Sequence, residues 1–280
     1  MRLLRRRRPV PITCFDGATG AWADTGAKES VDCDELTVCT YNIWNDDKKA
    51  HARYSAIADL LSRRTPDIMV FQEVTEDALD VLLSAQWIRN GYSRAAVVGG
   101  GVGDYGMLVL SRLPIARVVH TRLPTRQSRG FLQAEIAING GRLVVCCIHL
   151  DSGKSSSWLR GWQLRRIFGA LKTAEDAVVL GDFNIRDDEN SRIAAPYRDV
   201  WPVLRPGEDG FTEDTSINLM RYDMKDKHRH VRFDRVLLKS RRWTATKIES
   251  LGTEPIAAGL PRVFPSDHFG LECRLTNRNP

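Results

Sequence analysis

The sequence predicts one layered domain that contains both helices and strands, of the α/β or α+β class. Short apolar or β-branched runs alternate with longer stretches in which apolar residues recur every three or four positions. The turn sequence Asn139-Gly140-Gly141 lies between two apolar runs, which predicts a β-hairpin and therefore antiparallel pairing in the sheet. At 280 residues, the chain is long enough to bury one large hydrophobic core.

The expected elements begin at residue 36. Apolar or β-branched runs predict strands at 36–42, 67–72, 106–111, 131–138, 142–149, 177–181, 231–238 and 268–275. Helical periodicity, as at Ile57, Leu60 and Leu61, predicts helices at 49–64, 76–86 and 156–172. Trp158 and Trp162 are four residues apart on the third helix and are expected to pack into the core. The glycine-rich stretch 99–103 lacks the Lys and Ser/Thr of a phosphate-binding P-loop, so it is interpreted as a turn.

Residues 1–34 show no hydrophobic periodicity and are expected to form a basic, loosely ordered leader before a single domain at 35–277. Five arginines lie in residues 1–8, and without them the 41 basic residues nearly balance the 35 acidic ones. The formal net charge of +6 therefore comes mainly from the leader, and the total alone does not identify a nucleic-acid surface.

Three features of the sequence predict a location inside the cell. The apolar runs fall short of the roughly 18 residues that a membrane-spanning helix needs, so no membrane association is expected. The two residues Leu3 and Leu4 are too few for the apolar core of a signal peptide. Six cysteines without CxxC spacing are expected to be reduced. These features predict an intracellular protein, nuclear or cytoplasmic.

Polar side chains lie at the ends of six predicted strands. Each alone has a structural explanation, because Asp and Asn favour turns and Ser-Asp can cap a helix. Six strands that all deliver such residues indicate a shared site. The residues are Asn42, Gln72 and Glu73, His149, Asp182 and Asn184, Asp234, and Asp267 and His268.

If these residues converge, four carboxylates share one cleft, namely those of Glu73, Asp182, Asp234 and Asp267. Their mutual repulsion favours a bound cation. Oxygen ligands without a Cys or paired-His pattern suit Mg²⁺ better than zinc, with Mn²⁺ as a substitute ion. A metal ion, a carboxylate that deprotonates water and donors for the developing charge are the requirements of phosphoester hydrolysis.

Six motifs in order resemble the endonuclease/exonuclease/phosphatase superfamily. They are TYNIW (40–44), FQEV (71–74), HLDSG (149–153), GDFN (181–184), FDRV (233–236) and SDH (266–268). The resemblance covers the whole domain and implies that 35–277 is a catalytic domain. It also implies a four-layer sandwich, in which two mixed β-sheets are flanked by helices and the site lies at the edges of the sheets.

Several stretches are most similar to the tyrosyl-DNA phosphodiesterase 2 branch, which cleaves the 5′-phosphotyrosyl bond left by a trapped topoisomerase. They include the segments 181–187, 212–218, 232–235 and 264–271. Two positions depart from that branch. Phe183 stands where the branch has Thr, and Glu213 stands where it has a Trp that grips the DNA end. An acid facing the strand is therefore expected in place of base stacking.

The resemblance implies a role for each site residue. Glu73 would be the main Mg²⁺ ligand, with Asn42 beside it and Asp267 reaching the metal. Asp182 would activate the attacking water, and Asn184 would hold that water or a phosphate oxygen. His149 and His268 would donate to the non-bridging oxygens, with Asp234 fixing the tautomer of His268. The implied substrate-binding residues are Arg129, Arg232, Ser152, Thr212 and Asn218.

The predicted function is thus Mg²⁺-dependent hydrolysis at DNA or RNA 5′ ends, including protein–DNA adducts, by a monomer. One alternative is another chemistry on the same fold: an endonuclease, a phosphoinositide phosphatase or a sphingomyelin phosphodiesterase. A second is a non-catalytic nucleic-acid-binding module, which the complete set of site residues disfavours. The acid-free stretch with Arg112, Arg117, Arg122, Arg126 and Arg129 is interpreted either as a phosphate-tracking face or as ordinary solvated surface.

Overall fold

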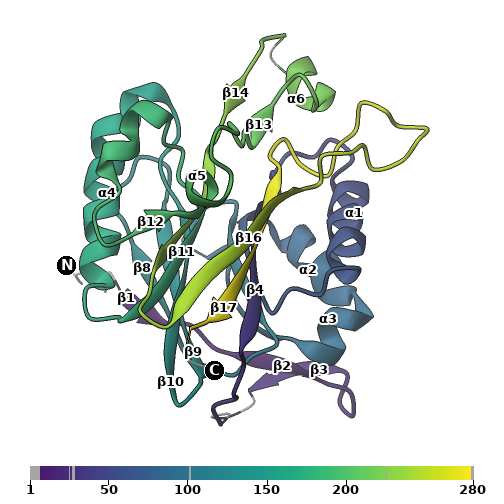
Figure 1. The fold of residues 1–280 in the computed structure, drawn as a ribbon. Coiled ribbons are helices and arrows are strands. Elements are labelled where there is room, and N and C mark those ends of the chain that lie inside the picture. The colour runs from purple at the N-terminus through teal and green to yellow at the C-terminus, as the bar shows by residue number, and fades with distance from the viewer. Residues whose placement is uncertain (1–6, 25, 27–28, 101, 225, 279–280) are drawn as a thin grey trace, which may run out of the picture.

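The computed structural model describes residues 7–24, 26, 29–100, 102–224 and 226–278. Two β-sheets face each other at the centre, and helices cover the outer face of each sheet (Figure 1). Both sheets contain parallel and antiparallel pairs. The predicted α+β sandwich of four layers with two mixed sheets is therefore confirmed.

The first large sheet has eight strands in the order β16-β17-β4-β5-β7-β6-β2-β3. Its strands are β2 (Thr13–Asp16), β3 (Ala21–Asp24), β4 (Glu35–Asn42), β5 (Ile68–Val74), β6 (Ser93–Val97), β7 (Gly106–Ser111), β16 (Trp243–Leu251) and β17 (Gly270–Asn277). Strands β4 and β5 are parallel and end together, with Asn42 opposite Gln72. This shared end is one side of the site described below.

The second large sheet has seven strands in the order β1-β8-β9-β10-β11-β15-β12. Its strands are β1 (Arg7–Pro9), β8 (Ile115–Arg122), β9 (Gly130–Ile138), β10 (Gly141–His149), β11 (Asp176–Asp182), β12 (Arg198–Asp199) and β15 (Asp234–Lys239). The predicted hairpin at Asn139 and Gly140 joins β9 to β10, and both residues have the positive φ that a tight hairpin turn requires. A separate two-stranded pair, β13 (Glu213–Asp214) and β14 (His230–Val231), lies beside the site.

Helices cover the two outer faces of the sheets. The helices are α1 (Ala50–Ser62), α2 (Glu76–Ser84), α3 (Gln86–Gly91), α4 (Ser157–Ala170), α5 (Val200–Leu204) and α6 (Leu219–Asp223), with short 3₁₀ turns η1 (Lys154–Ser156) and η2 (Asp187–Arg192). Ile57 and Leu61 of α1 pack with Phe71 of β5, and Leu164 and Ile167 of α4 pack with strands β10 and β11. The largest apolar core fills the space between the two sheets. None of the helices among the described residues is long and apolar enough to cross a membrane.

The N-terminal segment corrects the expectation of a loosely ordered leader. Strand β1 pairs with β8 at the edge of one sheet, and β2 pairs with β6 at the edge of the other. Backbone pairing rather than an amphipathic pattern holds these residues, so hydrophobic periodicity could not reveal them. Arg5 and Arg6 of the arginine run lie outside the described residues, and the predicted boundary at residue 35 stays a prediction.

Trp158 and Trp162 differ from the prediction that they pack into the core. Their side chains are 55% and 61% exposed on the outer side of α4. The buried side of that helix is instead formed by Leu159, Gln163 and Leu164. Counting four-residue spacing identified the helix correctly, but the spacing alone does not say which of its faces points inward.

Candidate active site

Three site residues lie side by side because neighbouring strands bring them into register. His149, the last residue of β10, lies opposite Asp182, the last residue of β11. Asp182 in turn lies opposite Asp234, the first residue of β15. Gly181 permits the close approach, since a Cβ atom there would be 2.1 Å from the carbonyl oxygen of Ile148. The polar strand ends of this sheet therefore converge as predicted.

The facing sheet contributes Asn42 and Glu73 from the ends of β4 and β5. The pairing of β5 with β7 shifts register between Gln72 and Val74, so Glu73 sits in a β-bulge with a positive φ of 61°. Its carboxylate accepts hydrogen bonds from the backbone N–H of Asn45 at 3.1 Å and from Asn42 Nδ2 at 3.3 Å. Asn42 Nδ2 also donates to Asp182 Oδ2 at 3.1 Å. Asn42 therefore joins the two sheets across the site.

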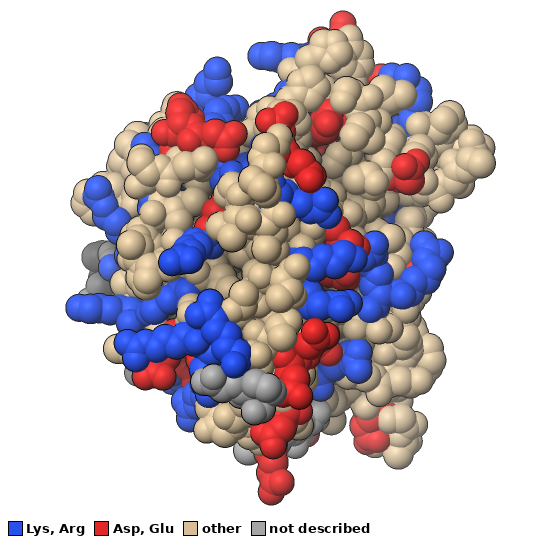
Figure 2. Space-filling view, viewed as in Figure 1, with Lys and Arg blue, Asp and Glu red and all other residues tan. Residues whose placement is uncertain are grey.

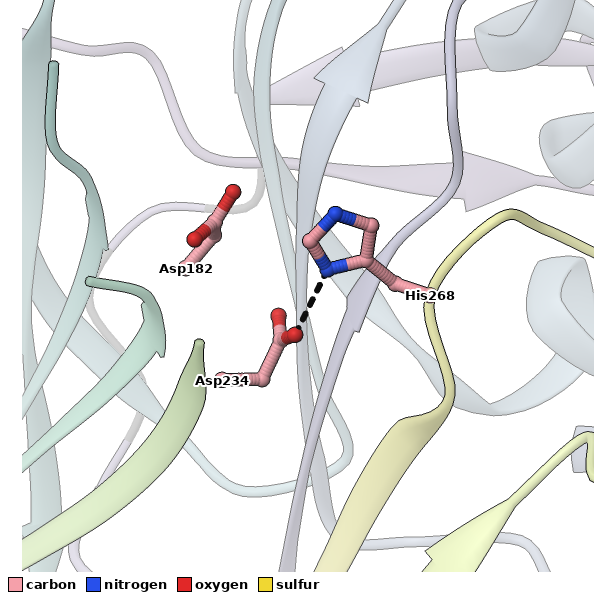
Figure 3. A group of neighbouring side chains, drawn as sticks. All are labelled: Asp182, Asp234 and His268. Carbon is pink, nitrogen blue, oxygen red and sulfur yellow. Dashed lines mark hydrogen bonds and ion pairs between the residues drawn. The ribbon is translucent and has the colours of Figure 1, made fainter. Parts of the chain in front are cut away.

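His268 reaches the same place from the segment before β17. Its Nδ1 atom lies 2.7 Å from Asp234 Oδ2, and Figure 3 shows this pair with the Asp182 carboxylate facing the same space. Ser266 Oγ holds the segment by donating to the carbonyl oxygen of Asn42 at 2.7 Å and by accepting from the backbone N–H of His268 at 3.2 Å. The Ser-Asp-His motif thus ties its own loop to the end of β4.

The protonation of the two histidines follows from their partners. Arg129 Nη1 lies 2.9 Å from His149 Nδ1, and because arginine has no acceptor, His149 Nδ1 must accept. The His149 proton is therefore on Nε2, which lies 3.3 Å from Asp182 Oδ2 and 3.8 Å from Glu73 Oε1. For His268, burial lowers the pKa, but the negative charges of Asp234 and Asp267 outweigh burial and hold the pKa well above its ordinary value.

Asp182 is held in its unprotonated form. Burial raises the pKa of this carboxyl, but contact with His149 and the positive charge of His268 outweigh burial, so the pKa lies well below its ordinary value. Asn184 also stabilises the charged form of Asp182. Its backbone N–H donates to Asp182 Oδ1 at 2.9 Å, and its Nδ2 donates to Oδ2 at 3.0 Å. Asn184 has a positive φ of 52°, a strained conformation of the kind that clusters at functional sites.

The donor set suits a hard divalent cation. Glu73, Asp182, Asp234 and Asp267 bring four carboxylates to one place, and Asp267 shows the resulting excess of negative charge. Burial and then the charges of Glu73 and Glu213 raise the pKa of Asp267 to about 7, against the opposing charge of His268. Ligand atoms of Asp182, Asp234 and His268 lie within 4.8 Å of one another, as do those of Glu213, Asp267 and His268. Carboxylate oxygens without cysteine are the set that Mg²⁺ and Mn²⁺ accept.

Glu213 does not face outward as expected from its place in the sequence. It is buried, and its carboxylate pairs with Arg229 Nε at 2.9 Å and with Arg221 Nε at 3.3 Å. Glu213 Oε1 also lies 3.6 Å from His268 Nε2, and Arg221 lies 3.6 Å from Asp267. Two arginines neutralise this acid, so its position beside the site does not repel a nucleic-acid strand. Nothing in the isolated motif identified Arg221 and Arg229 as its partners.

The predicted substrate-binding residues divide into two groups. Arg129 and Ser152 lie on the two loops next to His149, where Ser152 Oγ accepts from Gln127 Nε2 at 2.9 Å. Arg232 is nearly buried and is held by Asp199 at 2.6 Å and Asp187 at 3.4 Å. Arg129 is equally buried but contacts Tyr105 and His149, while the charge of Arg232 is offset by two acids.

Thr212 and Asn218 stay predictions as substrate-binding residues, and neither side chain has any exposed surface. Thr212 Oγ1 accepts from the backbone N–H of Asp234 at 3.0 Å, which fixes the start of β15. Asn218 caps α6 and donates to the carbonyl oxygen of Ser266 at 2.8 Å. Both residues therefore hold the backbone at Asp234 and at Ser266.

Two further residues of the site were not predicted from the sequence. Tyr105 accepts from Arg129 at 2.9 Å, and its ring lies 6.1 Å from that of His149. Asp151 accepts from Thr125 Oγ1 at 2.6 Å and from the backbone N–H of Arg126 at 2.9 Å, so it links the two loops beside His149. Tyr105 lies just after the glycine-rich stretch, where no strand pattern marks it. Asp151 lies within the HLDSG motif, which was a signal that could have revealed it.

Several curated proteins are similar to this chain in sequence. A tyrosyl-DNA phosphodiesterase 2 from Gallus gallus is 28% identical over 239 residues, which cover 80% of this chain and 62% of the relative. The enzyme of the same name from Danio rerio is 29% identical over 262 residues, which cover 88% and 68%. The chain thus spans about two thirds of the length of these relatives.

Solved structures show the same fold. TDP2 from D. rerio, in complex with a single-strand DNA product, matches with a TM-score of 0.78 and 25% identity over 86% of this chain and 99% of that one. A truncated Caenorhabditis elegans TDP2 matches with a TM-score of 0.74 and 23% identity over 86% of this chain and 97% of that one. The model of the Endonuclease/Exonuclease/phosphatase family matches residues 39–268, which contain every site residue described above. This chain belongs to the endonuclease/exonuclease/phosphatase family.

Proposed function

We propose that the chain is a metal-dependent phosphodiesterase that hydrolyses the 5′-phosphotyrosyl bond at nucleic-acid ends. The observation that carries the proposal is the register of His149, Asp182 and Asp234 on adjacent strands, completed by His268. The set pairs an unprotonated carboxylate with hydrogen-bond donors on either side of it. The two relatives described above are both named tyrosyl-DNA phosphodiesterase 2, which supports this substrate.

Glu73, Asn42 and Asp267 are the proposed ligands of Mg²⁺, for which Mn²⁺ would substitute. When bound, such an ion polarises the phosphate and neutralises its charge. Burial is the first cause that raises the pKa of Asp267 to about 7, and the negative charges of Glu73 and Glu213 add to it, which supports placing a cation here. Asn42 would also position the metal ligand Glu73 and the base Asp182, since its amide Nδ2 donates to both carboxylates.

The chemical step uses residues of this chain in fixed positions. Asp182 orients a water molecule and accepts its proton as the water oxygen forms a bond to phosphorus. The bond from phosphorus to the tyrosyl oxygen breaks, and the phenolate that leaves takes a proton from solvent. His268, kept positive by Asp234, and the Nε2–H of His149 stabilise the charge that develops on the non-bridging oxygens.

The proposed partner is DNA with a covalent protein or peptide adduct at its 5′ end, and an RNA 5′ end would present the same phosphate. Arg129 would contact that phosphate beside His149. We propose that the chain acts as a monomer inside the cell, in the nucleus or the cytoplasm. An endonuclease or a phosphoinositide phosphatase would use the same residues, so the identity of the substrate is the point to test.

The test offers the purified chain four substrates: a 5′-phosphotyrosyl oligonucleotide, a 5′-phosphorylated oligonucleotide, an abasic duplex and a phosphoinositide. Each is assayed with Mg²⁺, with Mn²⁺ and with EDTA. Release of tyrosine from the first substrate alone, abolished by EDTA and restored by added Mg²⁺, is the expected result. Cleavage of the abasic duplex or the phosphoinositide alone would replace the proposed substrate, and full activity in EDTA would contradict the metal requirement.

A further inference from the structure

The exposed face of α4 carries two tryptophans. Trp158 and Trp162 lie one helical turn apart, with 55% and 61% of their surface exposed, so both rings are on the same side of the helix. Among the described residues, the large apolar side chains that are exposed include only these two aromatic ones. Exposed aromatic pairs of this kind have no role in the core and indicate a surface for a partner.

Basic groups surround the tryptophans. The Arg126 guanidinium lies 5.8 Å from the centre of the Trp158 ring, in a cation–π contact. Arg165 and Arg166 continue along the exposed side of α4, and the chain has no acidic residue from 152 to 174. The nearest acidic turn is η2, where Glu189 pairs with Arg160 and Arg192. We call Arg126, Trp158, Trp162, Arg165 and Arg166 the α4 surface.

Figure 2 shows that lysine and arginine side chains form several separate groups on one face of the molecule, with acidic side chains between them. Positive charge alone therefore does not identify one binding surface. The α4 surface is distinguished by exposed aromatic rings next to its basic groups. Nucleic acid offers both complementary parts, phosphates for the guanidinium groups and base faces for the indoles. A second copy of this chain would instead bring arginine against arginine.

One loop, which carries Arg126 and Arg129, contacts both the α4 surface and the candidate active site. Asp151, two residues after His149, accepts from the backbone N–H of Arg126 at 2.9 Å and so fixes the loop beneath Trp158. On the same loop, Arg129 donates to His149 Nδ1 at 2.9 Å. A cavity of about 280 Å³ lies along this loop and is lined by Arg122, Arg126 and Arg129 among others, without any acidic residue. A phosphate chain that leaves the site beside Arg129 meets Arg126 and then Trp158.

We propose that the α4 surface binds the single-stranded part of the nucleic-acid substrate. Unpaired bases stack on Trp158 and Trp162, while the phosphates follow Arg129 and Arg126 back to the site. This inference rests on the proposed function for the placement of the 5′ end, but the binding itself requires no chemistry. It predicts that the enzyme prefers long single-stranded ends over short ones.

The test compares the wild type with the double variant Trp158→Leu/Trp162→Leu, which keeps apolar side chains but removes the rings. The control variant is Val203→Ser on α5, which changes an apolar side chain that is 60% exposed. In EDTA, the Kd for a fluorescent 15-nucleotide oligothymidylate is measured by anisotropy. Stacking predicts a Kd about tenfold higher or more in the double variant, and no change in the control.

A kinetic readout separates this surface from a merely structural role of α4. With 5′-tyrosyl oligothymidylates, the double variant is expected to raise the KM for a 15-mer about tenfold and to leave the values for a 3-mer unchanged. An unchanged Kd and KM would overturn the proposal, as would a change in oligomeric state with nucleic-acid binding intact. If no tyrosyl substrate is cleaved but the Kd still depends on the tryptophans, the α4 surface stands and the proposed function fails.

Discussion

The Nδ1 atom of His268 lies 2.7 Å from Oδ2 of Asp234, a residue 34 positions earlier in the chain. Asp234 also lies opposite Asp182 in the pairing of β11 with β15. One buried carboxylate therefore lies beside a histidine whose pKa is raised, while the next stays unprotonated. The same strand pairing that builds the sheet thus places both carboxylates beside His268.

Replacing Asp234 with Asn is expected to reduce kcat about 10²-fold or more, because His268 loses the charge that keeps it protonated and oriented. The measurement is the release of tyrosine under saturating substrate. Thr212→Val should lower kcat in the same direction but less, since it removes only the acceptor for the backbone N–H groups of Phe233 and Asp234. Asp223→Asn, which alters an exposed ion pair with Arg262, is the matched control. A kcat of Asp234→Asn equal to that of this control would contradict the role of Asp234.

Glu213→Gln is expected to lower the free energy of unfolding by about 3 kcal/mol, because it leaves Arg221 and Arg229 without their buried partner. The measurement is urea unfolding followed by tryptophan fluorescence. Glu208→Gln is the control, since its pair with Arg205 is exposed and should change stability by less than about 1 kcal/mol. Equal stability of the two variants would mean that the Glu213 pairs do not contribute as a buried network.

Acid is expected to destabilise the fold through His120. Burial, followed by the charges of Arg8 and Arg122, lowers the pKa of this histidine to about 4, against 6.5 in the unfolded chain. Between these values the unfolded chain binds more protons, so the contribution is complete above pH 6.5 and is lost as the pH falls toward 4. It amounts to about 3 kcal/mol between pH 7.5 and pH 4.5.

The measurement is the free energy of unfolding as a function of pH for the wild type and for His120→Gln. The variant cannot titrate at this position, so its curve should fall less steeply between pH 6.5 and pH 4.5. Parallel curves for the two proteins would show that His120 is not held neutral in the folded state.

Sequence patterns predicted the elements that build the site. The strands ending at Asn42, His149 and Asp182 were predicted within two residues of their observed bounds, because each is a buried apolar run that ends in a polar residue. Strand β16 was not predicted, because it lies at a sheet edge and its middle residues are exposed. Its partners, rather than its own pattern, determine its conformation.

The contacts of individual site residues could not be predicted as well as the strands. These contacts depend on which side chains are buried, and the sequence does not give burial directly. Thr212 and Asn218 were assigned to substrate, yet both are buried and hold the backbone near Asp234 and Ser266. Glu213 was expected to face the strand, yet it pairs with two arginines that are eight and sixteen positions away. Such pairs form because the connection from β13 to β14, which contains α6, folds back over Glu213, and local spacing does not reveal them.

The most direct test of the account is a single-turnover measurement with Asp182→Asn on a 5′-phosphotyrosyl oligonucleotide in Mg²⁺. Asp188→Asn, an exposed acid of η2, serves as the matched control. The account predicts that Asp182→Asn slows tyrosine release by about 10²-fold to 10⁴-fold, while the control keeps the wild-type rate. A wild-type rate for Asp182→Asn would contradict the assignment of Asp182 as the base and, with it, the proposed active site.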